Sequence, residues 1–407
     1  MELKSYHFYS GSNDLKEFFI FIRFFFYSFF YSNHNLEKNL TKSFNSYLGS
    51  KDTLFFASGR MALFSILKSL DIGEGDEVII PAYTCVVVPN AIIYRSAKPI
   101  YVDINLSDFN LNVNQIEKLI TKKTKAIYAQ HTFGNKCNMK KLRSIANKYG
   151  IFLIEDSAHL IEKNQILKSD ADVTFFSTDR SKILNTYLGG FVASNNTAII
   201  NKLKKNYKEV SRAPTKIAWH MYLSYILEFI LLSKYFYFFG RYIHAFLAKI
   251  KIIFFFKDEL KLTIPSSYPY PCKMPPGIMF LLSNQLKIID KNLSHRKKIS
   301  SYLYSQLTGR MVSNQKSCAL LRYSMLVKDR SKMIKIFGKI DFNIWFSSVT
   351  EGRYSNYDEV NYIEGSCPNA EYATKHIINF PTHLQIDISY LEKVFSKNKK
   401  SIKNLLH

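Results

Sequence analysis

The sequence predicts an α/β fold, in which a mostly parallel central sheet carries helices on both faces and a smaller C-terminal α+β domain follows. Three observations support this prediction. Between residues 53 and 200, short β-rich runs alternate with amphipathic helical segments. The runs are almost continuously apolar, which is typical of strands buried on both faces of a sheet. Polar residues gather where the runs end, and such sheets bind ligands beyond the carboxyl ends of their strands.

The expected strands are six short runs: 77–83, 98–104, 124–130, 151–156, 173–177 and 190–194. Helical segments such as 61–70 and 138–150 lie between them. The second has apolar residues at helical spacing and a helix stop at Gly150.

Beyond these runs, we expect a Pro-rich connection at 265–276, one long helix at 281–307, and short strands with a final helix in 308–407. The sequence then divides into three parts. They are an aromatic-rich N-terminal arm (1–52), a large domain (53–262) that includes an aromatic-rich helical insertion at about 215–257, and a small C-terminal domain (263–407).

The composition is strongly basic, with a net charge of +24. Such a charge favours anionic partners such as acidic lipid or phosphate-bearing substrates, although dispersed lysines also fit a compositional bias. No Arg-rich block is present, so nucleic acid is not an expected partner. The five cysteines are scattered without CxxC spacing, which predicts neither a disulfide framework nor a metal site. A reducing compartment and the absence of a secretory signal predict a cytoplasmic protein.

Two aromatic-rich stretches complicate this interpretation. Residues 18–31 contain Arg23, and residues 217–233, which contain Glu228, continue into 235–256. Each falls short of the roughly 20 apolar residues that a spanning helix needs. Their basic flanks would suit helices lying in a membrane interface at the inner face of the membrane. The first stretch is otherwise a buried helix or a subunit contact, and the second fits interfacial docking and internal packing equally.

Three polar clusters stand at strand ends. In the first, Ser58-Gly59-Arg60 precedes a helix; free amides, a glycine and a cation make an anion site, although a plain cap and turn is the simpler interpretation. In the second, an apolar strand ends in Asp156, with His159 three residues on. A strand-end carboxylate can hold a protonated heterocyclic nitrogen, or it can cap the next helix.

The third cluster is FFSTDRSKILNTYLGG, residues 175–190. Ser177 can donate to a phosphate, Gly189-Gly190 allows close backbone approach, and Lys182 can form an imine if it is partly desolvated. Taken alone, Lys182 could equally be a surface lysine. Together and in this order, the three clusters match what pyridoxal 5′-phosphate (PLP) requires: a phosphate cradle, a counter-ion for the pyridine nitrogen and a lysine for the aldehyde.

At these segments the chain resembles the DegT/DnrJ/EryC1/StrS aminotransferases, which are sugar aminotransferases among the PLP-dependent transferases of fold type I. The matching segments are 57–63, 71–92, 98–112, 124–135, 154–159, 175–183 and 188–190, with weaker matches at 367–373 and 378–383. The resemblance implies that Lys182 forms the imine and Asp156 pairs with the pyridine nitrogen. His159 would lie near the phenolic oxygen, and Ser177 with the Ser58-Gly59-Arg60 turn would hold the phosphate.

Two positions depart from the family pattern. The family often has Thr or Ser where this chain has Arg60, and an aromatic residue that stacks on the cofactor ring where this chain has Cys85. Either Tyr83 substitutes for that aromatic ring or the stacking is weaker. The resemblance also implies a homodimer whose second subunit completes the site.

The expected activity is therefore transfer of an amino group, from glutamate in most of this family, to a keto sugar carried on a nucleotide, for surface polysaccharide or related amino-sugar synthesis. Lysine at position 182 favours transamination over the family's dehydratase-like members, which use histidine there. Two alternatives stay open at this point. One is an inactive, membrane-associated scaffold of the same fold, and the other is a PLP enzyme that acts on a non-sugar ketone.

Overall fold

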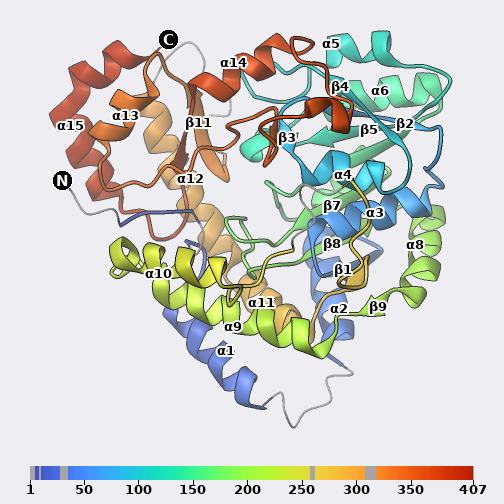
Figure 1. Cartoon of the computed structure of the whole chain (residues 1–407), viewed down its shortest axis with the longest axis horizontal. Coiled ribbons are helices and arrows are strands. Elements are labelled where there is room, and N and C mark those ends of the chain that lie inside the picture. Colours follow the sequence, from blue (N-terminus) through green and yellow to red (C-terminus); the bar gives the residue numbers. More distant parts are fainter. Residues whose placement is uncertain (1–4, 9–10, 28–34, 257–261, 308–317, 407) are drawn as a thin grey trace.

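The computed structural model describes residues 5–8, 11–27, 35–256, 262–307 and 318–406. Its main element is a nine-stranded sheet, with a smaller α+β unit beside it (Figure 1). In spatial order the strands are β4 (Lys98–Val102), β2 (Glu77–Pro81), β5 (Thr124–Gln130), β6 (Phe152–Asp156), β7 (Val173–Ser177), β8 (Gly190–Ser194), β1 (Asp52–Phe56), β10 (Cys272–Lys273) and β9 (Ser211–Arg212). The first five are parallel, and β8 and β1 are each antiparallel to the strand before them.

The six predicted strands are all present, with ends shifted by two residues or fewer. Three strands of this sheet were not expected. β1 lies beside β8, β9 lies beside β10, and β10 falls within 265–276, which the sequence predicted to be only a connection. β10 is two residues long, too short to leave an apolar pattern, yet Cys272 is buried and Lys273 pairs with Phe56.

Helices cover both faces of the sheet, as predicted. On one face lie α3 (Gly59–Ser69) and α8 (Thr197–Glu209), and on the other lies α6 (Met139–Tyr149), which ends at Gly150. Alternate strand residues point to opposite faces. Val78, Ile80, Ala126, Tyr128 and Ile154 therefore belong to the core around α3, whereas Ile79, Ile127, Ala129 and Leu153 pack with α6.

The expected single helix at 281–307 is instead two helices, α11 (Pro276–Lys287) and α12 (Ile289–Gln306), which meet at Ile288. α12 leads from the sheet to the smaller unit (Figure 1). That unit pairs β11 (Arg322–Leu326) with β13 (Ile377–Pro381) and has its own core against α13 (Arg330–Ile336) and α15 (Ile388–Leu405). The boundary at 262/263 stays a prediction, although α11, which follows it, packs in the core of the large sheet.

The remaining elements are short or peripheral. They are α2 (Leu36–Leu48), β3 (Thr84–Cys85), α4 (Val87–Ile93), α5 (Val113–Ile116), η1 (Glu117–Leu119), η2 (Thr132–Gly134), α7 (Gln165–Lys168), β12 (Thr350–Glu351), η3 (Tyr357–Val360) and α14 (Pro368–His376).

The aromatic-rich stretches form α1 (Leu15–Tyr27), α9 (Thr215–Leu231) and α10 (Tyr237–Lys249). One side of α1 packs internally: the Phe18 ring stacks on Phe229 of α9 at 4.4 Å, and Phe24 stacks on Phe280 of α11 at 4.3 Å. Residues 28–31 of the first stretch lie outside the described residues. Among the helices that are described, none is long and apolar enough to cross a bilayer.

Candidate active site

A cavity of about 360 Å³ lies at the carboxyl ends of the parallel strands. Seven of the eight predicted site residues line it: Ser58, Gly59, Arg60, Asp156, His159, Ser177 and Lys182. They come from the ends of β1, β6 and β7 and from the loop after β7. Because parallel strands end at one edge, residues up to 124 positions apart in sequence meet here.

The N-terminus of α3 forms one wall. Ser58 is its N-cap, and its Oγ accepts a hydrogen bond from the Met61 amide at 3.4 Å. A Cβ on Gly190 would lie 2.5 Å from the Gly59 nitrogen, so only glycine lets the helix end approach β8 this closely. The cap and the anion site are thus compatible, since the helix end, Arg60 and Ser177 all line the cavity.

The loop from Ser177 to Gly189 adds a second group to this wall. Ser181 has a φ of 69°, and its buried hydroxyl has no hydrogen-bond partner within the described part of the chain. Since buried hydroxyls are normally satisfied, a cavity-lining one without a partner fits a site that accepts a ligand oxygen. A phosphate group fits this cradle.

Lys182 is partly buried and lines the cavity. Burial lowers the pKa of its amine below the usual value, and the nearby Asp179 carboxylate opposes that shift. The amine nitrogen lies 4.7 Å from the centre of the Trp345 ring. The surface-lysine interpretation is therefore wrong. The lowered pKa makes a larger share of the amine neutral than it would be in water, and an imine forms from the neutral amine.

Residues from the N-terminal segment hold the backbone of this loop. The Ser12 hydroxyl donates to the Lys182 carbonyl at 3.4 Å, and Ser12 in turn accepts from the buried Arg296 guanidinium at 2.9 Å. The Asn13 amide donates to the Asn185 carbonyl at 2.9 Å. The position of Lys182 thus depends on contacts with Ser12 and Asn13, which lie just before α1.

Asp156 ends β6 with both carboxylate oxygens engaged. The Tyr128 hydroxyl donates to Oδ2, and the Ala158 amide donates to Oδ1 at 2.7 Å. Burial raises the pKa of Asp156, and the hydrogen bond from Tyr128 opposes this. The helix-cap alternative is wrong, because the next helix, α7, begins only at Gln165.

The tautomer of His159 follows from its contacts. Its Nδ1 accepts a hydrogen bond from the Phe133 amide at 3.1 Å, so the ring proton lies on Nε2. Burial holds the pKa of His159 well below its usual value. The neutral ring, which stacks with Trp345 at 5.8 Å, presents a hydrogen-bond donor.

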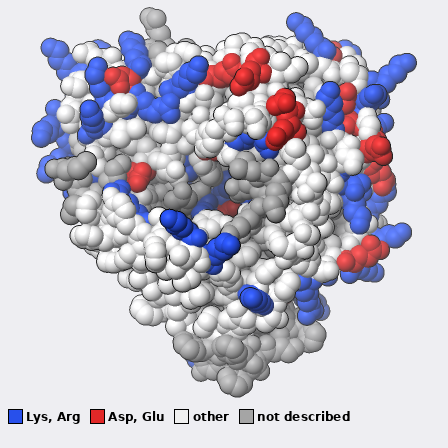
Figure 2. Space-filling view, viewed as in Figure 1, with Lys and Arg blue, Asp and Glu red and all other residues white. Residues whose placement is uncertain are grey.

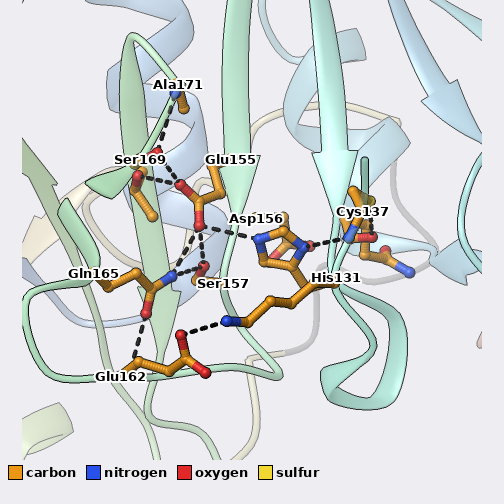
Figure 3. A network of polar contacts seen from close by, with 12 residues as sticks. His131, Cys137, Glu155, Asp156, Ser157, Glu162, Gln165, Ser169 and Ala171 are labelled. Atoms are coloured by element: carbon orange, nitrogen blue, oxygen red, sulfur yellow. Dashed lines mark hydrogen bonds and ion pairs between the residues drawn. The ribbon is translucent and has the colours of Figure 1, made fainter. Parts of the chain in front are cut away.

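Behind Asp156, a buried network fixes the end of β6 (Figure 3). Glu155 accepts hydrogen bonds from His131, Ser157, Gln165, Ser169 and Thr174. Because the Cys137 amide donates to Nδ1 of His131, that ring donates to Glu155 through Nε2. Burial alone would raise the pKa of Glu155, but the hydrogen bonds from His131, Ser169 and Gln165 lower it to about 2. Glu155 is therefore an anion that anchors the strand.

Tyr83, the eighth predicted residue, does not line the cavity. Its ring is fully buried against Phe109, Phe133 and Phe346, and its hydroxyl donates to the Phe346 carbonyl at 3.1 Å. The prediction was wrong because the chain turns after β2 and directs this ring into the core. Cys85 does line the cavity, and the aromatic rings there are instead those of Tyr128, Phe175, Phe255, Phe256, Trp345 and Phe346, besides the imidazole of His159.

Several cavity residues were missed. Tyr128 lies inside a predicted strand, where a tyrosine is usually only a core residue. Arg180 stacks on Phe255 at 4.2 Å and pairs with Glu228 at 3.2 Å, and Arg60 lies 5.9 Å from the Phe256 ring. The insertion thus supplies a wall of the cavity, a role that its aromatic composition did not reveal.

The mostly parallel sheet covered on both faces is the fold of the fold-type-I transferases. The lysine, the strand-end carboxylate and the anion cradle around its cavity fit a PLP molecule. The model of the DegT/DnrJ/EryC1/StrS aminotransferase family matches residues 26–226. This segment is just under half of the chain, and over it the chain is similar to that family.

Two relatives illustrate the match. The GDP-perosamine synthase of Vibrio cholerae is 32% identical over 185 residues, which is 45% of this chain and 50% of the relative. The dTDP-3-amino-3,6-dideoxy-alpha-D-galactopyranose transaminase of Aneurinibacillus thermoaerophilus is 34% identical over 172 residues, 41% of this chain and 47% of the relative. The chain thus spans about half the length of the curated relatives it matches.

Among solved structures, NtdA of Bacillus subtilis with bound cofactor PMP superimposes with a TM-score of 0.72. The alignment covers 96% of this chain and 82% of NtdA at 18% identity. This likeness shows that the fold extends beyond the segment that the family model matches.

Proposed function

We propose that this protein is a PLP-dependent aminotransferase that moves an amino group from an amino acid to a nucleotide-linked keto sugar. The observation that carries the proposal is that Lys182 and Asp156 line the same cavity as an anion cradle. The names of the two relatives, both acting on nucleotide sugars, support the substrate class.

The cavity residues would hold the cofactor by its two ends. The α3 N-terminus, Arg60, Ser177 and Ser181 would bind the phosphate, and Asp156 would pair with the ring nitrogen. His159 would donate its Nε2 proton to the phenolic oxygen. When bound, PLP supplies an electron sink for the carbon that loses its proton.

Lys182 is the residue we assign to proton transfer. Its lowered pKa keeps a share of the amine neutral, so that it can accept the proton from the substrate carbon and return it to the cofactor. A positioned base of this kind is worth about 10²–10⁴-fold in rate. Trp345, beside the amine, keeps water from that side of the site.

The proposed partners are glutamate as amino donor and a second copy of the chain. Arg180, also in the cavity wall, provides a cation suited to the diphosphate of a nucleotide sugar. We also propose that the protein is cytoplasmic and touches the inner face of a membrane peripherally, which its net charge of +24 supports.

The activity is tested on purified protein incubated with PLP. We expect a yellow protein. Borohydride should remove the colour and leave the cofactor covalently attached. Glutamate should also bleach the colour, and a nucleotide-linked keto sugar should then restore it. A colourless protein would favour the inactive scaffold. Restoration by a cyclitol ketone but by no nucleotide sugar would favour a non-sugar substrate.

A further inference from the structure

Helix α10 carries a stripe of exposed apolar side chains. Its residues recur at spacings of three and four, so they share one helix face: Phe236, Phe239, Tyr242, Ile243, Phe246 and Ile250. Phe239 is 62% exposed, Tyr242 61% and Phe246 60%. Soluble surfaces rarely leave so many large rings together in water, and such a stripe therefore indicates a partner.

The opposite face fixes α10 on the protein. A Cβ on Gly240 would overlap the carbonyl of Leu231, so the backbones of α10 and α9 touch there. The Tyr237 hydroxyl donates to Asp341 at 2.8 Å, and His244 lies 2.8 Å from the buried Glu228. These contacts hold the helix in one orientation and point the stripe, which we call the α10 stripe, away from the core.

The charged residues next to the stripe in the sequence have one sign. Lys234, Arg241, Lys249 and Lys251 flank it, and the sequence has no acidic residue from 229 to 257. One acidic side chain from another element, Asp341, lies 3.8 Å from the Arg241 guanidinium. The lower left of the molecule, over α9 and α10, is mostly free of acidic side chains (Figure 2).

We infer that the α10 stripe lies in the headgroup region of an anionic bilayer. The aromatic and aliphatic side chains of the stripe would contact the upper part of the acyl chains. The lysines at its edges would contact the lipid phosphates. A second copy of this chain fits less well, because a twofold contact would place the same cations against one another. The inference deepens the proposed peripheral contact by assigning its surface.

Docking would also bring the site close to the membrane. Phe255 and Phe256, which follow α10 by six and seven residues, line the cavity. Arg180 and His244 contact the same Glu228 oxygen, so one carboxylate joins the cavity wall to α10. The bilayer would therefore lie against the insertion that closes one side of the cavity.

The test is co-sedimentation of the PLP-loaded protein with phosphatidylcholine vesicles that contain or lack phosphatidylglycerol. The test variant is Phe239→Glu/Phe246→Glu. Its matched control is Leu167→Glu/Ile363→Glu, which changes two side chains of 67% and 75% exposure elsewhere by the same charge. We expect the test variant to lose about tenfold or more in partitioning onto anionic vesicles, and the control to lose far less. Lys249→Gln/Lys251→Gln should lose about fivefold per cation.

Equal binding by the test variant and the wild type would overturn the α10 assignment while leaving peripheral contact intact. Binding of the wild type to neither vesicle would overturn both proposals. Self-association that the test variant abolishes would overturn the α10 assignment, since a second copy would then cover the stripe. Thermal unfolding and the yellow colour of each variant report folding and cofactor binding. They keep the aminotransferase proposal separate from this result.

Discussion

Replacing Tyr128 with phenylalanine tests how the protein tunes Asp156. The variant keeps the ring but removes the hydroxyl that donates to Oδ2, which leaves one oxygen of a buried carboxylate without that donor. A hydrogen bond to a charged group contributes about 1.5–3 kcal/mol, so the cofactor-free protein should lose about that much stability.

Cofactor binding should change in the opposite direction. Asp156 with one donor fewer is a more basic carboxylate, because burial already raises its pKa and Tyr128 opposes the rise. It should therefore pair more strongly with a protonated ring nitrogen. The stabilisation that saturating PLP provides should then be larger in Tyr128→Phe than in the wild type.

The assay is thermal or urea unfolding of each protein with and without PLP. The control is the same substitution in an Asp156→Asn background, where the coupling should largely vanish because the amide carries no charge. A cofactor-dependent stabilisation that is unchanged or smaller in Tyr128→Phe would refute the reasoning. So would an equal effect in the Asn background.

The other predictions concern the lysine, the carboxylates and the glycine contact. Lys182→Ala should lose at least about 10²-fold in transamination rate while retaining the wild-type unfolding profile, measured by single-turnover kinetics. Asp156→Asn should still bind PLP by absorbance but lose most of the rate. The pKa of Glu155 is lowered to about 2, so its contribution to the stability of the fold is fully present above the pKa of the unfolded chain, near 4.5, and is lost as pH falls toward 2. Glu155→Gln should therefore flatten this part of the acid-unfolding curve. Gly190→Ala should weaken PLP affinity by pushing the α3 N-terminus off β8, and unchanged affinity in a titration would contradict the proposed cradle.

Residues at strand ends were predictable because the periodicity of the strands locates their ends, and parallel pairing then brings those ends together. Asp156 and Ser177 were found in this way, whereas Ser58 followed from the start of its helix and Lys182 from its loop. Trp345 was not predictable, since it lies in another unit 163 positions from Lys182, and no local pattern connects the two. Tyr83 was wrongly predicted to contact the cofactor. The turn after β2 determines the direction of its ring, and no pattern in a single sequence indicates that direction.

The helices were predicted less well than the strands. The break at Ile288 has no proline or glycine to mark it, and the apolar spacing continues across it. For the aromatic-rich stretches, the composition was compatible with internal packing or with an exposed, membrane-facing helix, and the structure contains an example of each. α1 packs Phe18 and Phe24 internally, whereas α10 leaves Phe239 and Phe246 in solvent.

The turn that contains Ser12 and Asn13 has a practical consequence. Their hydrogen bonds reach a loop about 170 positions later in the chain, so the site cannot take its final shape until that distant segment has been synthesised. A tag, a nick or a deletion within the first fifteen residues would disturb the lysine as directly as a change beside it. Preparations of this protein should therefore leave the segment around Ser12 and Asn13 unchanged.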